Sequence, residues 1–213
     1  MRDTGDEMDS YTNNLCSSDN AILLVIDFQP KVFNLTVNFK SVKALAIKLL
    51  KLADLFKVPT VICEQYPKGL GPTDPDIMAV YDAMSSDKMI FPKLAFGCCG
   101  EEGFLSLLQE KASIVRQKRQ GLPDSAPVDL IIMGIEAHVC VLQTVLGLLE
   151  ADSYRPVLAD DCITGRSMRQ HHLAISRLQA AGAVVSNFES IAFEWTRRKD
   201  DERFKRVNGL LKE

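Results

Sequence analysis

The sequence predicts an α/β fold with a single doubly wound, Rossmann-like sheet of six parallel strands and helices on both of its faces. Short, unbroken apolar runs recur along the chain, and such runs are typical of strands that are buried on both faces. Between them lie segments whose apolar residues recur with the helical period. Strands and helices that alternate in this way favour a parallel sheet joined by right-handed crossovers.

The strands are expected where the apolar runs stand. The first run, at 21–27, ends in Asp27, and the run at 156–160 likewise ends in an acid. The remaining runs that predict strands lie at 59–63, 88–91, 128–134 and 183–186. Neither an internal repeat nor a linker divides the chain, so one domain is expected.

The helices are expected between these runs. At 39–57, apolar residues recur at helical spacing with lysines between them. Further helices are expected at 75–84, 101–111, 137–151, 167–181 and over most of the chain after 186. The Gly- and Pro-rich stretch 64–75 predicts a loop. The stretch 113–127, where basic residues precede a glycine and two prolines, predicts an irregular insert with a solvated surface.

The composition is that of an average globular domain. Of the 213 residues, 46% are hydrophobic and 25% are charged, which excludes an intrinsically disordered chain. The longest apolar runs are much shorter than the roughly 20 residues that a membrane span needs, so no membrane association is expected. The net charge of −3 argues against a general nucleic-acid binder, which normally carries a basic excess.

Residues 1–19 contain one arginine against five acids, and they are expected to form a disordered, acidic tail ahead of one folded domain at 20–213. A mitochondrial presequence is basic and poor in acids, so this segment argues against import. The six cysteines show neither a CxxC pair nor regular spacing. They are interpreted as thiols in a reducing compartment, which predicts a cytoplasmic protein.

Polar side chains stand where several strands are expected to end. Because ligands of an open parallel sheet bind at the carboxyl ends of its strands, an acid, a lysine and a cysteine are expected to meet there: Asp27, Lys93 and Cys140. Further candidates for lining a substrate pocket are Gln29, Glu64, Gln65 and His138. The motifs GxGxxG, Walker A and GxSxG are absent from the sequence, which argues against dinucleotide enzymes, NTPases and serine hydrolases.

Cys140 is the most informative of these residues. It is expected at the start of a helix, where backbone N–H groups and the helix dipole lower the pKa of a thiol. The Lys93 ammonium would favour the thiolate further, and Asp27 can accept the thiol proton and return it to a leaving group. The alternative is a buried structural thiol, the usual fate of a free cysteine, and composition alone favours that alternative.

Four segments carry a resemblance to a known family. They are LLVIDFQ at 23–29, EQYPKGLG at 64–71, FPKLAF at 91–96 and, most specifically, GIEAHVCVLQT at 134–144. Over residues 20–213 the chain resembles the isochorismatase-like cysteine hydrolase superfamily, and within it most closely the isochorismatase domain-containing branch. The resemblance implies a hydrolase domain over those residues, in which Asp27, Lys93 and Cys140 form the catalytic triad.

The resemblance also implies a cis peptide bond between Ile135 and Glu136, an oxyanion hole made by the backbone N–H groups of Glu136 and Cys140, and a homo-oligomer. The sequence offers separate support for an oligomer in an apolar helical stripe near its end. The stripe consists of Phe188, Ile191, Ala192 and Trp195. It either packs on its own sheet or faces outward to a second copy.

In one respect the chain departs from nicotinamidases. Those relatives bind a divalent metal through an Asp-x-His-x-x-His segment, whereas the corresponding stretch here, EQYPKGLGPTDPDI, contains no histidine. Neither a metal ion nor any other cofactor is therefore expected, and nicotinamide is not the expected substrate. Isochorismatases that cleave a vinyl ether generally do without a nucleophilic cysteine, so Cys140 favours an amidase-like reaction.

Three functions follow as hypotheses. The leading one is a hydrolase of a small amide-like or ester-like bond that acts through a thioester on Cys140. The second is a catalytically inactive, oligomeric interaction protein of the same fold. The third is a nucleic-acid hydrolase, which the acidic balance disfavours although basic runs at 116–119 and 197–199 keep it open. A small-molecule substrate and further copies of the same chain are the expected partners.

Overall fold

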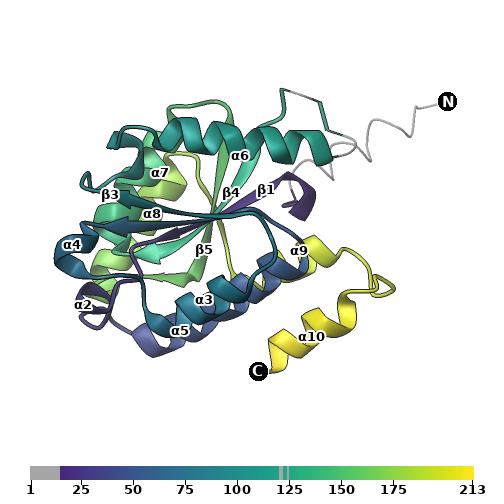
Figure 1. Cartoon of the computed structure of the whole chain (residues 1–213), viewed down its shortest axis with the longest axis horizontal. Coiled ribbons are helices and arrows are strands. Elements are labelled where there is room, and N and C mark those ends of the chain that lie inside the picture. Colours follow the sequence, from purple (N-terminus) through teal and green to yellow (C-terminus); the bar gives the residue numbers. More distant parts are fainter. Residues whose placement is uncertain (1–14, 120–121, 124) are drawn as a thin grey trace.

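The computed structural model describes residues 15–119, 122–123 and 125–213 and is shown in Figure 1. Six parallel strands form one sheet in the order β3-β2-β1-β4-β5-β6. The strands are β1 (Ala21–Ile26), β2 (Thr60–Gln65), β3 (Lys88–Lys93), β4 (Val128–Ile135), β5 (Tyr154–Thr164) and β6 (Val184–Ser186). The predicted six-stranded, doubly wound parallel sheet is confirmed.

Helices connect the strands. They are α2 (Pro30–Phe33), α3 (Phe39–Leu55), α4 (Pro67–Leu70), α5 (Pro75–Ala83), α6 (Phe104–Lys118), α7 (Leu142–Leu149), α8 (Met168–Ala180), α9 (Phe188–Thr196) and α10 (Phe204–Lys212). Short 3₁₀ turns lie at Ser18–Asn20 and Cys98–Gly100, and a π-helical turn at Ala137–Val141 leads into α7. In the part of the chain that the structure describes, no helix is both long and apolar enough to cross a membrane.

Apolar side chains pack against both faces of the sheet. Successive side chains of a strand point to opposite faces. In β1, Leu23 and Val25 join the core under α3, α5, α9 and α10, whereas Ile22 and Leu24 join the core under α6, α7 and α8 (Figure 1). Full burial of each such side chain contributes about 2 kcal/mol, so the central strand holds both helix layers in place.

The first part of the expected insert at 113–127 is helical. Helix α6 runs on to Lys118, well past the expected end of the helix, and the following Arg119 is buried. The Arg119 guanidinium donates to Asn20 Oδ1 at 3.0 Å, to the Ala126 carbonyl at 3.0 Å and to the Pro123 carbonyl at 2.6 Å. Because its donors are used to close the loop, this basic residue does not form the expected solvated surface.

The expected N-terminal tail is only partly described, since residues 1–14 lie outside the described residues. The residues just before β1 pack against the domain. Cys16 is buried, its N–H donates to Glu194 Oε2 at 2.6 Å, and its carbonyl accepts from Arg197 at 2.9 Å. The folded part of the chain therefore begins ahead of residue 20, because α9 and the turn after it supply partners for this backbone.

The apolar stripe of Phe188, Ile191, Ala192 and Trp195 lies on α9 and faces inward. All four side chains are buried in the core on the α3 side of the sheet, and the Trp195 ring lies 5.7 Å from that of Phe56. The stripe thus packs on its own sheet, so it offers no support for an oligomer.

Candidate active site

The residues expected at the strand ends lie at one edge of the sheet. Asp27 follows β1, Lys93 is the last residue of β3, and Cys140 lies in the π-helical turn after β4. Strands β1 and β4 are neighbours, yet the helices that follow them cover opposite faces of the sheet. This reversal is the switch point at which open α/β sheets bind their ligands.

The Lys93 ammonium is completely enclosed. Its Nζ donates to Asp27 Oδ2 at 2.8 Å, to Gln65 Oε1 at 2.7 Å and to the Phe96 carbonyl at 3.0 Å, and its side chain is 0% exposed. Burial by itself lowers the pKa of Lys93, but the Asp27 carboxylate opposes this effect through its charge and a hydrogen bond, and the pKa is raised. Lys93 therefore stays charged and fixes one oxygen of Asp27.

Asp27 leaves its second oxygen available. The chain turns sharply here, since the residue adopts a left-handed backbone with φ of 59°, a conformation that aspartate tolerates better than most residues. Oδ1 is buried and has no hydrogen-bond partner among the described residues. Burial raises the pKa of Asp27, although Lys93 and the Cys140 thiol oppose this rise. The carboxylate is thus a stronger base than usual, with one oxygen free to take a proton.

Cys140 does not behave as the helix-start argument predicts. Burial raises the pKa of its thiol, the Asp27 carboxylate raises it further, and Lys93 only opposes the rise. Both effects oppose the expected resting thiolate, because sulfur that is withdrawn from water beside a carboxylate gives up its proton less readily. A thiol in this state needs a neighbouring base to take its proton before it can act as a nucleophile.

A small cavity opens over these residues. Its volume is about 200 Å³, and Asp27, Gln65 and Cys140 contribute to its wall. The peptide bond between Ile135 and Glu136 is cis, as the resemblance implied. Glu136 lines the cavity together with Cys140. A backbone N–H in that position suits an oxyanion hole.

The four candidate pocket residues differ in where their side chains lie. Only Gln65 lines the cavity, where its Nε2 also donates to the Leu94 carbonyl at 2.8 Å. Gln29 is fully buried, and its Nε2 donates to the carbonyls of Gln65 at 2.9 Å and Gly71 at 2.6 Å, so it ties the loop after β2 to β1.

Glu64 and His138 also point elsewhere. Glu64 Oε1 accepts from the backbone N–H of Thr73 at 2.7 Å and from its hydroxyl at 2.8 Å. His138 is absent from the cavity wall, and its Nδ1 is buried beside Gly165 without a hydrogen-bond partner among the described residues. Position at a strand end predicts proximity to the site but not the direction of the side chain.

Sequence reasoning missed most of the cavity wall. The apolar part comes from Val32, Leu70, Phe96, Ile135 and Val139. Arg166 also lines the cavity and forms a hydrogen-bonded ion pair with the Glu136 carboxylate. The one available signal was the place of Arg166 shortly after β5, at the same edge of the sheet as the other site residues.

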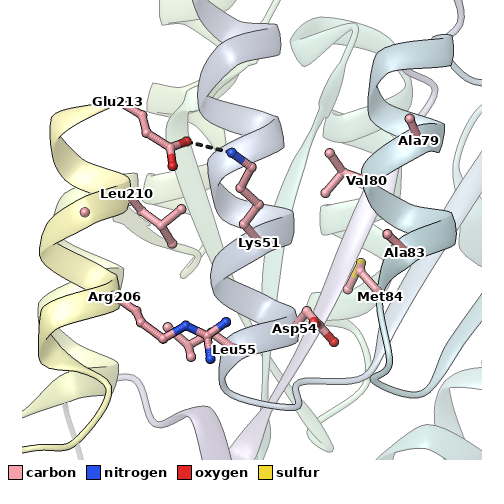
Figure 2. Close-up of a pocket in the computed structure, with 11 residues that line it drawn as sticks. Lys51, Asp54, Leu55, Ala79, Val80, Ala83, Met84, Arg206, Leu210 and Glu213 are labelled. Carbon is pink, nitrogen blue, oxygen red and sulfur yellow. Dashed lines mark hydrogen bonds and ion pairs between the residues drawn. The ribbon is translucent and has the colours of Figure 1, made fainter.

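A larger cavity lies between α3, α5 and α10 and is shown in Figure 2. Its volume is about 560 Å³, Leu55, Val80 and Leu210 supply apolar wall, and a Lys51–Glu213 ion pair of 2.6 Å spans one side. The described residues that line it include no cysteine, serine, threonine or histidine. It therefore offers no thiol or hydroxyl nucleophile among these residues, whereas Cys140 lines the smaller cavity, which is the candidate active site.

The described residues include no group of three or more His, Cys, Asp or Glu side chains placed to hold a metal ion. In the loop that corresponds to the metal-binding segment of nicotinamidases, Asp74 caps α5 through the Asp76 N–H at 3.0 Å and pairs with Lys43 at 3.1 Å. That catalysis needs no metal stays a prediction.

Comparison with known proteins identifies the family. The isochorismatase domain model matches residues 21–190. Isochorismatase domain-containing protein 2 of Bos taurus is 31% identical over 194 residues, which cover 91% of this chain and 84% of that protein. Among solved structures, one described as the MAR1 ribonuclease of Caenorhabditis elegans has a TM-score of 0.76 and 29% identity, and the match covers 93% of each chain.

A second solved structure shows the same fold. The YcaC gene product of Escherichia coli, described as an octameric hydrolase of unknown specificity, has a TM-score of 0.74 and 19% identity, and the match covers 93% of this chain and 95% of that one. The domain match spans most of the sequence and includes the segments that carry Asp27, Lys93 and Cys140. The chain therefore belongs to the isochorismatase family.

Proposed function

We propose that this protein is a cysteine hydrolase that cleaves a small amide or ester through a thioester on Cys140. One observation carries the proposal: the buried Asp27 carboxylate contacts the Cys140 thiol, Lys93 holds one of its oxygens at 2.8 Å, and the other oxygen has no hydrogen-bond partner among the described residues. Nucleophile, base and orienting group are the three parts that covalent acyl transfer needs.

In the first step, the Cys140 S–H proton moves to Asp27 Oδ1 while the sulfur attacks the substrate carbonyl carbon. The carbonyl π electrons move to the oxygen, and the N–H groups of Glu136 and Cys140 stabilise this oxyanion. When the intermediate collapses, the C–N or C–O bond breaks and Asp27 returns the proton to the leaving group. An acyl group is then bound to the Cys140 sulfur as a thioester.

In the second step, water replaces the leaving group. Asp27 takes a proton from the water, whose oxygen attacks the thioester carbon, and the same N–H groups hold the second oxyanion. Collapse breaks the C–S bond, the acid product leaves, and the proton on Asp27 returns to the sulfur. Lys93 remains charged throughout and keeps Asp27 aligned with the reacting atoms.

A hydrolysis screen tests the proposal. Small amides and esters are offered to the wild-type protein, to Cys140→Ala and to Cys98→Ala, a control at another buried thiol near the site. We expect activity in the wild type and the control, and a loss of more than about 100-fold in Cys140→Ala. Equal activity in wild type and Cys140→Ala would refute the mechanism, and no activity towards any substrate would favour an inactive interaction protein.

Ribonuclease activity is the second candidate, because the similar structure from Caenorhabditis elegans is described as a ribonuclease. The arginines of the two basic runs give ribonuclease activity little support. Arg119 is enclosed by its loop, Arg198 pairs with Asp200 at 2.7 Å, and Arg197 binds the Cys16 carbonyl. Since phosphate contacts dominate nucleic-acid affinity, free cations would be needed. RNA cleavage that disappears in Cys140→Ala would favour this candidate.

We also propose that the protein is a homo-oligomer in a reducing compartment such as the cytoplasm. Large apolar side chains stay exposed along the edge strand β3 and just after it, with exposed fractions of 43% for Met89, 68% for Leu94 and 57% for Phe96. A second copy of the chain would cover them. All six cysteines are free thiols, as expected where disulfides do not persist.

A further inference from the structure

The cavity beside Cys140 is small and mostly apolar. Its volume of about 200 Å³ lies below the roughly 300–1,000 Å³ of pockets that hold drug-sized ligands. Five of the side chains in its wall are hydrophobic: Val32, Leu70, Phe96, Ile135 and Val139. A compact substrate with an apolar acyl group fits such a wall, because burial of a polar group without a partner costs free energy.

Four charged side chains meet this cavity or lie directly behind it, and they form two pairs. Lys93 neutralises Asp27 at 2.8 Å. Arg166 neutralises Glu136, with its Nε donating to one carboxylate oxygen and its Nη2 donating to the other at 3.4 Å. The charges of the four groups therefore sum to zero.

The Glu136–Arg166 pair decides what charge the site can accept. The Glu136 side chain is only 9% exposed, whereas that of Arg166 is 59% exposed, so the arginine forms the solvent side of the pair in the cavity wall. An arginine with a free guanidinium binds a carboxylate through two parallel hydrogen bonds. Here that two-pronged contact is already made with Glu136, and no unpaired cation remains for an anionic ligand among the described residues that line the cavity.

We propose that the site selects small, uncharged acyl substrates and rejects substrates that carry a carboxylate, and that the Glu136–Arg166 ion pair sets this specificity. The reaction itself rests on the proposed function, whereas the charge selection rests on the cavity alone. Both claims can therefore fail separately. A carboxylate-bearing ligand would enter an apolar cavity with no counter-charge, and Glu136 would repel it.

Two alkylating reagents of the same shape test the selection without any turnover. Iodoacetamide is neutral and iodoacetate is anionic, and both transfer a carbon to sulfur with loss of iodide. The rate of Cys140 alkylation by each reagent is measured by peptide mapping and divided by the rate for free glutathione. We expect the wild-type protein to prefer iodoacetamide by at least about tenfold, since one uncompensated charge at close range has an effect of this size.

A series of charge variants assigns the effect to the ion pair. Glu136→Gln leaves the Arg166 charge unbalanced, so the preference for iodoacetamide should fall at least about tenfold. Arg166→Gln leaves the Glu136 carboxylate unbalanced, so the preference should rise. The double variant Glu136→Gln/Arg166→Gln restores neutrality and should return to the wild-type value. Labelling of Cys99, which is partly exposed outside this cavity, should keep the same preference in all four proteins.

Two results would overturn the charge selection. They are equal relative rates for the two reagents in the wild type, and a preference that is unchanged across the series. Thermal unfolding of each variant establishes that it is folded. If the charge series behaves as expected while no amide or ester is hydrolysed, the selection stands and the proposed hydrolase function fails.

Discussion

At the scale of the residue, the site works through the contrast between the two oxygens of Asp27. Lys93 binds Oδ2, while Oδ1 is buried without a partner among the described residues. The sequence could predict that Asp27, Lys93 and Cys140 lie at one edge, because strand ends of a parallel sheet meet there. It could not predict the raised pKa of Cys140, because helix position is visible in a sequence whereas burial and contact with Asp27 are not.

Asp27→Asn tests two roles of this carboxylate, which accepts a proton in the reaction and raises the pKa of Cys140. The substitution removes the proton acceptor, so hydrolysis should fall by about 100- to 10,000-fold. It also removes the negative charge that raises the pKa of Cys140, so that pKa should fall and alkylation by iodoacetamide should reach its half-maximal rate at a lower pH than in the wild type. A midpoint that stays in place or moves to higher pH would contradict the contact between the two side chains.

Lys93→Met leaves Asp27 buried without its counter-charge and should destabilise the protein by about 3–5 kcal/mol at pH 7. The folded-state pKa of Asp27, already raised, should rise further once Lys93 is gone. A raised folded-state pKa favours folding below the unfolded-state pKa, and that contribution is lost as the pH rises through the folded value. The free-energy deficit in urea unfolding should therefore shrink towards acidic pH.

The double variant Asp27→Asn/Lys93→Met is the control for this prediction. It removes the unpaired charge together with its partner and should recover a large part of the lost free energy at pH 7. The loss of unfolding free energy in Lys93→Met could instead be the same at every pH and persist in the double variant. That result would show that lost packing, and not charge, explains the loss.

At the scale of the element, the loop after β2 positions the site from a distance. Gln29 fastens this loop by donating to Gln65 and Gly71 and by accepting from the Gln65 N–H at 2.8 Å. Composition predicted the loop, and unbroken apolar runs predicted the strands. Neither could show that Gln29 and Glu64 serve the loop, because side-chain direction depends on backbone turns such as the left-handed one at Asp27.

Gln29→Ala should lower the free energy of unfolding by about 1–3 kcal/mol, because it leaves buried backbone groups of the loop without partners. Hydrolysis should also fall, since Gln65 holds Lys93 at 2.7 Å and depends on this loop. Gln109→Ala, at an exposed position of α6, is the matched control and should change neither quantity. Urea unfolding and steady-state rates measure both. Equal behaviour of the two variants would argue against this role of Gln29.

At the scale of the whole molecule, a doubly wound sheet brings distant segments together at the carboxyl ends of its strands. It also has an outer strand, β3, with exposed apolar side chains. Apolar runs that alternate with segments of helical period were enough to predict the sheet. The α9 stripe shows the limit of the same reasoning: its helical period predicted an apolar face, but only the packing of Trp195 near Phe56 reveals that this face turns inward. Several exposed large apolar side chains lie instead on β3 and just after it, namely Met89, Ile90, Leu94 and Phe96.

The protein should therefore associate through the β3 edge. Sedimentation at micromolar concentration should give a mass that is a multiple of the 23.7 kDa chain. Replacing Met89 and Leu94 by charged residues should shift the protein towards the monomer, whereas a charged residue at Leu173, which is also exposed but lies on α8, should leave the mass unchanged. A monomeric wild-type protein would contradict the proposed assembly.

The central claim is that catalysis passes through an acyl group on Cys140. The most direct measurement mixes the wild-type protein with a small neutral activated ester, quenches the mixture in acid within the first turnovers, and maps the adduct by peptide mass spectrometry. We predict one acyl group on the Cys140 peptide, released by hydroxylamine as a thioester is, and none in Cys140→Ala. Turnover of the ester at the wild-type rate by Cys140→Ala, with no adduct on the wild-type Cys140 peptide, would contradict the account.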